Sequence, residues 1–127
     1  LTRLDLSQNF ISRLPRKIFI YNERLNFLNL SRNFLKFIDF EEFYGFETLD
    51  FDLSHNLINV SFFKTNYYKD YRHINLRHNQ IDFYEFEYLR YHRVLLLLDL
   101  SHNLIKNFTY SKIKLYSKLE ILNLGFN

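Results

Sequence analysis

The stretch Leu95–Ile105 reads L-L-L-L-D-L-S-H-N-L-I and is the clearest copy of a pattern that recurs along the chain. Counted from Leu95, aliphatic side chains occupy positions 1, 4, 6 and 11 of the pattern, and an asparagine occupies position 9. Further copies begin at about residues 1, 25, 48, 71 and 119, and their asparagines follow at intervals of 24, 23, 23, 24 and 24 residues. This regular self-similarity predicts a solenoid in which each copy packs on the next.

The six-copy pattern resembles the leucine-rich repeat, L-x-x-L-x-L-x-x-N-x-L, over the whole chain. After its asparagine the first copy continues with Leu14-Pro15 and Phe19, and the second with Ile38, Phe43 and Phe46. These continuations are similar to the 24-residue typical subclass found in Toll-like receptors and small proteoglycans. The resemblance implies an α/β-type solenoid: a leucine-rich repeat arc with a parallel β-sheet on its concave face and an irregular or short-helical convex side.

Residues 1–127 are expected to form one repeat array, whose last copy is truncated and which has no terminal caps. Because solenoids need polar caps, we expect an interior fragment of a longer protein. The third copy departs from the pattern, since Thr48 stands where the first leucine is expected and Leu49 follows one residue later. Detail carried over from the family is therefore least transferable to that copy.

Each copy should begin with a short strand, because apolar and polar residues alternate over its positions 3–7. Positions 4 and 6 would point into the core, positions 3, 5 and 7 toward solvent on the concave face, and positions 2 and 8 toward its rim. The asparagine at position 9 falls where the chain leaves the strand, and its amide can both donate and accept hydrogen bonds. We predict that these asparagines form a buried structural ladder: Asn9, Asn33, Asn56, Asn79, Asn103 and Asn127.

Composition argues against several classes of function. The net charge is only +3, and the one-sided basic stretch from Lys106 to Lys118 carries too few charges to predict a nucleic-acid partner. The aliphatic run 94–98 is far too short for a membrane segment. No aspartate pair accompanies a nucleophile or a phosphate-binding loop, so we expect neither an enzyme nor a cofactor. The absence of cysteine does not decide the compartment, because secreted proteins of the family that the chain resembles usually keep their cysteines in the caps.

Three histidines share position 8 and should lie side by side on adjacent copies: His55, His78 and His102, with His73 nearby. Three imidazoles at such a spacing can hold zinc or sense pH. We favour the simpler interpretation, in which the rings are exposed at the strand ends, because no cysteine or fourth ligand accompanies them.

Position 5 alternates between acid and amide, in the order Asp5, Asn29, Asp52, Asn75, Asp99 and Asn123. The row is either a polar ligand-binding ladder or a way to avoid stacking like carboxylates, and both interpretations stay open. Outward apolar residues near the end of the chain form a candidate patch unless the 94–98 run is shifted by one residue: Leu96, Leu97, Ile121 and Phe126. The candidate ligand-binding residues on the concave face are Asp5, Asp52, His55, Asn75, His78, Leu97, Asp99 and His102.

Three N-x-S/T sequences are candidate glycosylation sites, at Asn29, Asn59 and Asn107. Asn59 and Asn107 should project from turns, whereas Asn29 should lie on the concave face. The resemblance implies a non-catalytic binding module from a Toll-like receptor ectodomain or a secreted repeat protein. Such a parent would be extracellular or secreted and would bind a protein or other macromolecule on its concave or lateral face, with a receptor dimer as a further option. The alternative is a cytoplasmic repeat scaffold that organises signalling partners.

Overall fold

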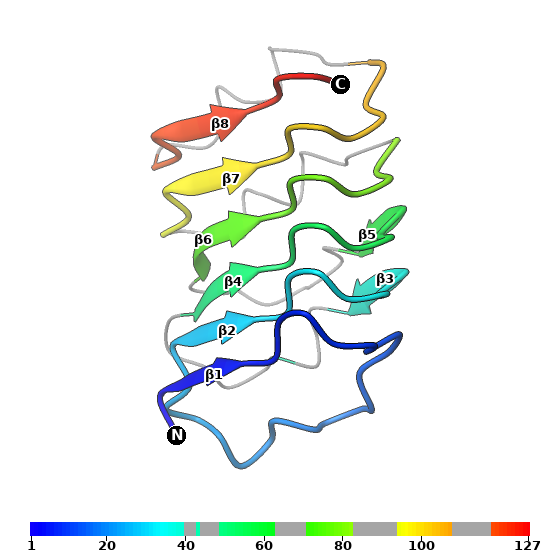
Figure 1. The fold of residues 1–127 in the computed structure, drawn as a ribbon. Helices are drawn as coiled ribbons and strands as arrows, with labels where there is room; N and C mark the ends of the chain where they lie inside the picture. Colours follow the sequence, from blue (N-terminus) through cyan, green and yellow to red (C-terminus); the bar gives the residue numbers. More distant parts are fainter. Residues whose placement is uncertain (40–42, 44–48, 63–70, 83–93, 108–117) are drawn as a thin grey trace.

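The computed structural model describes residues 1–39, 43, 49–62, 71–82, 94–107 and 118–127 (Figure 1). The six copies contribute one strand each to a parallel sheet in the order β1-β2-β4-β6-β7-β8. These strands are β1 (Arg3–Asp5), β2 (Phe27–Asn29), β4 (Leu49–Asp52), β6 (Tyr71–Asn75), β7 (Leu97–Asp99) and β8 (Ile121–Asn123). The expected parallel-sheet solenoid is confirmed.

The strands pair in the register that the repeat predicts. Leu28 lies opposite Phe51, and Leu98 lies opposite both Ile74 and Leu122. The aliphatic run 94–98 is therefore not shifted by a residue, and the residues of this run that were predicted to point away from the core do so. One irregularity occurs between β4 and β6, where Leu49 pairs with Tyr71 and the register then shifts.

Leu49 has no exposed surface, so it fills the inward place that the pattern assigns to the first residue of each copy. Thr48 and Phe46, which the repeat pattern also named, lie outside the described residues, as does the 108–117 part of the basic stretch.

The core is a column of inward side chains. Positions 4 and 6 are fully or almost fully buried in the four inner copies and half-buried in the first and last. Aromatic rings continue the column behind the sheet: Phe43 stacks on Phe19 with ring centroids 5.7 Å apart and meets Phe51 edge-on at 4.6 Å. Phe51 in turn meets Tyr71 edge-on at 5.3 Å. Burial raises the pKa of the Tyr71 hydroxyl, and the Asp39 carboxylate raises it further.

The buried asparagine ladder is confirmed in the four inner copies, where each asparagine links two copies. The predicted burial of Asn9 and Asn127 was wrong, because both lie in the terminal copies and are exposed. The amide nitrogen of Asn56 donates to the carbonyl of Leu53 in its own copy at 3.1 Å and to that of Leu30 in the preceding copy at 2.9 Å. Its side-chain oxygen accepts the backbone N–H of Leu35 at 3.0 Å. The same arrangement recurs at Asn33, Asn79, Asn103 and Asn127.

The strands end sooner than the alternation predicts, because all six stop at position 5. Three position-7 serines, which were expected to face solvent, are buried instead: Ser31, Ser54 and Ser101. That expectation was wrong because the period of two applies only while the backbone is extended. Beyond position 5 the chain turns inward.

The second halves of the copies contain a small second sheet that the sequence did not predict. Strand β3 (Phe37–Asp39) pairs in parallel with β5 (Val60–Phe62), on the side away from the main sheet (Figure 1). In the first copy the corresponding residues 13–15 form no strand, and turns follow over residues 16–21 and 23–24. In the part of the chain that the structure describes, the second halves contain no α-helix, so the short-helical convex side stays a prediction.

Candidate binding surfaces

The solvent-facing side of the six-stranded sheet, here called the sheet face, carries the position-5 row predicted to bind ligand. In all six copies the side-chain oxygen of this residue accepts the backbone N–H two residues ahead, at distances between 2.8 and 3.1 Å. Such Asx turns fix the exit from the strand. Asp5, Asp52, Asn75 and Asp99 therefore have a structural role, whether or not they also contact a ligand.

The alternation along this row has a direct physical reason. The Asn29 amide donates across strands to the Asp5 carboxylate at 3.3 Å, and the Asn123 amide donates to Asp99 at the same distance. The backbone N–H of Ser7, together with its hydroxyl and the Asn29 amide, lowers the pKa of Asp5. An amide between two acids thus supplies a donor where a third acid would add repulsion.

The position-3 row supplies the side chains of the sheet face that the turns do not engage. At one end the Arg3 guanidinium lies over the Phe27 ring, 4.2 Å from its centroid. In the middle His73 Nδ1 lies 3.2 Å from Asp50 Oδ1. The far end is apolar, where half-buried Leu97 pairs with Ile121, which is 52% exposed. Of this row only Leu97 was among the predicted ligand-binding residues, although the repeat register alone marks all six positions as outward.

The position-8 histidines form a stacked column at the edge where the chain leaves the sheet. The centroids of the His55 and His78 rings are 4.4 Å apart, and those of the His78 and His102 rings are 4.1 Å apart. Phe126 continues the stack at 4.5 Å from His102. His73 is not part of this column, because it pairs with Asp50 on the sheet face.

This stacking does not suit a shared metal ion, since ligand nitrogens must converge on the metal from the edges of their rings. Among the residues that the structure describes, no cluster of three or more histidine, cysteine, aspartate or glutamate side chains could hold a metal. Loss of hydration lowers the pKa of both His55 and His78, and the nearby positive charge of Arg77 lowers both further. The lowered pKa values favour neutral rings at His55 and His78 near pH 7.

Every residue at position 8 adopts a left-handed backbone conformation, with φ between 54° and 59°. The six residues are Gln8, Arg32, His55, His78, His102 and Phe126. Histidine tolerates this region better than most non-glycine residues, which accounts for its threefold use here. The repeat pattern places these residues at the rim but does not reveal the conformation, for which the repeated Ser-His-Asn sequence was the available signal.

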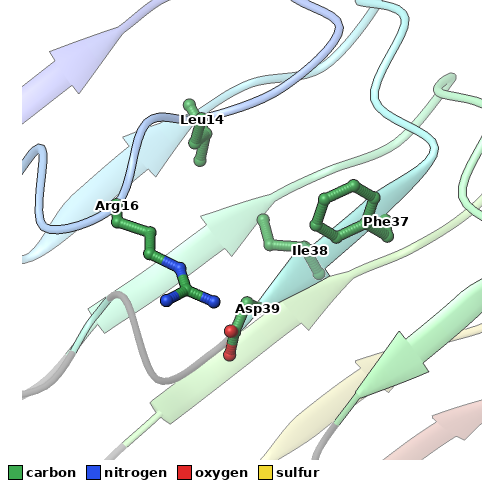
Figure 2. Close-up of a pocket in the computed structure, with 5 residues that line it drawn as sticks. All are labelled: Leu14, Arg16, Phe37, Ile38 and Asp39. Atoms are coloured by element: carbon green, nitrogen blue, oxygen red, sulfur yellow. The ribbon is translucent and has the colours of Figure 1, made fainter.

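A small pocket lies between the first two copies, on the side away from the sheet face. It encloses about 150 Å³ and is lined by Leu14, Arg16, Phe37, Ile38 and Asp39 (Figure 2). Pro15 has no N–H to donate, which is consistent with the first copy adding no strand to β3 at this edge. The volume suits a single partner side chain rather than a small-molecule ligand.

The three candidate glycosylation sites differ in their surroundings. Asn59 and Asn107 are exposed. Asn29 is half-buried, and both ends of its amide are engaged, by the Ser31 N–H and the Asp5 carboxylate. Within the described residues, no helix is long and apolar enough to span a membrane.

The stacked parallel strands, the asparagine ladder and the repeated strand exits define a leucine-rich repeat array. Residues 1–60 match the family model described as Leucine rich repeat, and together with the repeated structure this match supports a leucine-rich repeat family. Leucine-rich repeats are generally protein-interaction folds, which suggests a protein-binding module.

Among solved structures, the leucine-rich repeat domain of APL1B is similar to the whole of this chain, with a TM-score of 0.56 and 22% sequence identity. The match covers 50% of that structure, so this chain spans about half its length. At that identity the likeness shows the fold alone. No curated protein matches the chain. Neither match names a Toll-like receptor, so this finer resemblance stays a prediction.

Proposed function

We propose that the chain is the ligand-binding part of an extracellular leucine-rich repeat receptor or secreted repeat protein, and that it binds a protein on its sheet face. The supporting observation is the position-3 row, whose side chains face solvent on a backbone held by the Asx turns and the asparagine ladder. Because this backbone is already held in place, little further ordering is needed on binding, which lowers the entropic cost of association.

The row offers three kinds of contact in sequence: a cation over an aromatic ring, an acid beside an imidazole, and an apolar end. A protein surface with the complementary order of groups would meet all of them at once. The resemblance of the first two copies to the repeats of Toll-like receptors supports a receptor as the parent. An intracellular scaffold is the competing interpretation.

Glycosylation tests the location. Asn59 and Asn107 are exposed, and we expect both to carry glycans in an extracellular parent, whereas Asn29 is expected to be modified less because its amide is hydrogen-bonded. The measurement is mass spectrometry of the full-length parent from its native tissue, with and without glycosidase. Bare peptides at both exposed sites would favour the intracellular scaffold.

A further inference from the structure

A second exposed surface runs along the edge where each copy leaves the sheet. We call it the turn edge and define it by the exposed residues at positions 7, 8, 10, 12 and 13 of the copies. Its position-10 row is apolar in four of the five copies that contain this position, with Gln80 in the fourth copy. Phe10 is 88% exposed, Phe34 47% and Leu104 55%, whereas Leu57 is half-buried. The Phe10 and Phe34 rings lie nearly parallel, with centroids 6.0 Å apart. Exposed aromatic side chains gathered in a row tend to mark interaction sites.

The histidine column at position 8 precedes this apolar row at position 10 in the sequence, and the buried asparagines at position 9 lie between the two. In the part of the chain that the structure describes, no hydrogen bond engages the imidazole of His55 or His78. His102 Nε2 lies 3.4 Å from the Arg77 guanidinium. The column therefore presents ring edges with free polar nitrogens beside an apolar stripe.

Charge separates the turn edge from the sheet face. Around the turn edge, positions 7–13 of the first five copies contain five basic residues, all exposed, and one acid, Asp82. The basic residues are Arg13, Arg32, Lys36, Arg77 and Lys106. On the sheet face, positions 2, 3 and 5 contain five acids against two basic residues, the acids being Asp5, Asp50, Asp52, Asp99 and Glu120.

We propose that the turn edge is a second docking surface, for a protein segment that carries carboxylates interleaved with aromatic or aliphatic side chains. The apolar row at position 10 would bury the partner's apolar groups, and the flanking cations would pair with its carboxylates. A uniformly charged polyanion would leave the apolar row uncovered, and an uncharged apolar segment would leave the cations unpaired. The mixed segment satisfies both features, independently of what binds the sheet face.

The test uses three synthetic 12-residue peptides with the 127-residue chain, measured by isothermal titration calorimetry at pH 7.4 and low salt. The first alternates glutamate with phenylalanine or leucine, the second replaces each glutamate by lysine, and the third replaces each apolar residue by serine. We expect the first to bind and each of the others to bind at least about tenfold more weakly. Equal affinity for the first and third peptides would overturn the role of the apolar row.

Two variants test the site, and the sheet face supplies a matched control for each. Arg32→Glu and Phe34→Ser change exposed turn-edge residues, and each should weaken the first peptide about tenfold or more. Arg72→Glu and Ile121→Ser make the same kinds of change at exposed positions of the sheet face and should leave the affinity within about twofold. Circular dichroism of each variant checks that the fold is intact.

Weakening by the sheet-face controls as large as that by the turn-edge variants would place the peptide on the other surface and overturn the proposal. Tighter binding of an anionic phospholipid vesicle or a single-stranded oligonucleotide than of the first peptide would also overturn it. The proposed receptor function could fail without affecting these results, because they depend on the turn edge alone.

Discussion

Replacing Asn56 by alanine tests the ladder at its centre. The Asn56 side chain is 5% exposed and makes the bonds to Leu30, Leu35 and Leu53 described above. The two carbonyls are shared, since Asn33 also donates to Leu30 and Asn79 also donates to Leu53. Each carbonyl would therefore keep a partner. The N–H of Leu35 would not, because Asn56 is its acceptor among the described residues.

A buried N–H left without an acceptor costs about 1–3 kcal/mol, and each weakened carbonyl adds a smaller amount. We expect the free energy of unfolding to fall by about 2–3 kcal/mol. With an m-value near 2 kcal/mol/M, the urea midpoint followed by circular dichroism would fall by about 1–1.5 M. The amide proton of Leu35 should also exchange faster with solvent.

Asn9→Ala is the matched control, because it removes the same residue type from the same position of the repeat. Asn9 is exposed and bonds within its own copy, to the carbonyls of Leu6 at 3.1 Å and Ser7 at 3.0 Å. No described N–H donates to its side-chain oxygen, so the urea midpoint should fall by less than about 0.5 M. Equal midpoint shifts for the two variants would refute the account of the ladder as a link between copies.

Three further outcomes are expected. Leu53→Asp would bury a charge at a site with no exposed surface, so the variant should lose several kcal/mol and its hydrogen-exchange protection over residues 49–58. Asn75→Asp would line up three carboxylates on the position-5 row, lowering stability by about 1 kcal/mol; high salt should reduce the difference between urea midpoints. Because the folded pKa values of His55 and His78 are lowered, the unfolded chain binds more protons, and stability should decline as pH falls below about 6.5. Replacing both histidines by glutamine should flatten that decline in denaturation curves between about pH 7 and pH 5.

The sequence predicted the features that follow from stacking identical units. Leu98 could be assigned to the core in a run of identical leucines, because only one register aligned it with Ile74 and Leu122. The ladder was predictable for a similar reason, since a polar residue recurring in an apolar frame needs partners in every copy. The fourth copy's Tyr71 shows that the register outweighs residue type, because the ring is buried where leucine is usual.

Features that depend on the backbone beyond position 5 were not predicted from the sequence. Ser101 is buried because the strand has already ended, and an alternating pattern cannot reveal where the extended conformation stops. The Asx turn at Asp99 could have been found, since an aspartate two residues before a serine is a known turn signal. The pairing of β3 with β5 could not, because Phe37 and Val60 belong to segments in which the repeat pattern is weak.

Rows decide the surface chemistry of this fold, because stacking places equivalent residues of adjacent copies about 4.8 Å apart. At that spacing a row of like charges would repel strongly, since the screening length at physiological salt is about 8 Å. The chain avoids this by alternating Asp with Asn at position 5 and by using stacked imidazoles at position 8. The basic residues of the turn edge are likewise spread over positions 7, 8, 12 and 13 rather than stacked in one row. An acidic sheet face and a basic turn edge can therefore coexist on one array, because opposite charges lie on different faces while each row stays free of uninterrupted like charge.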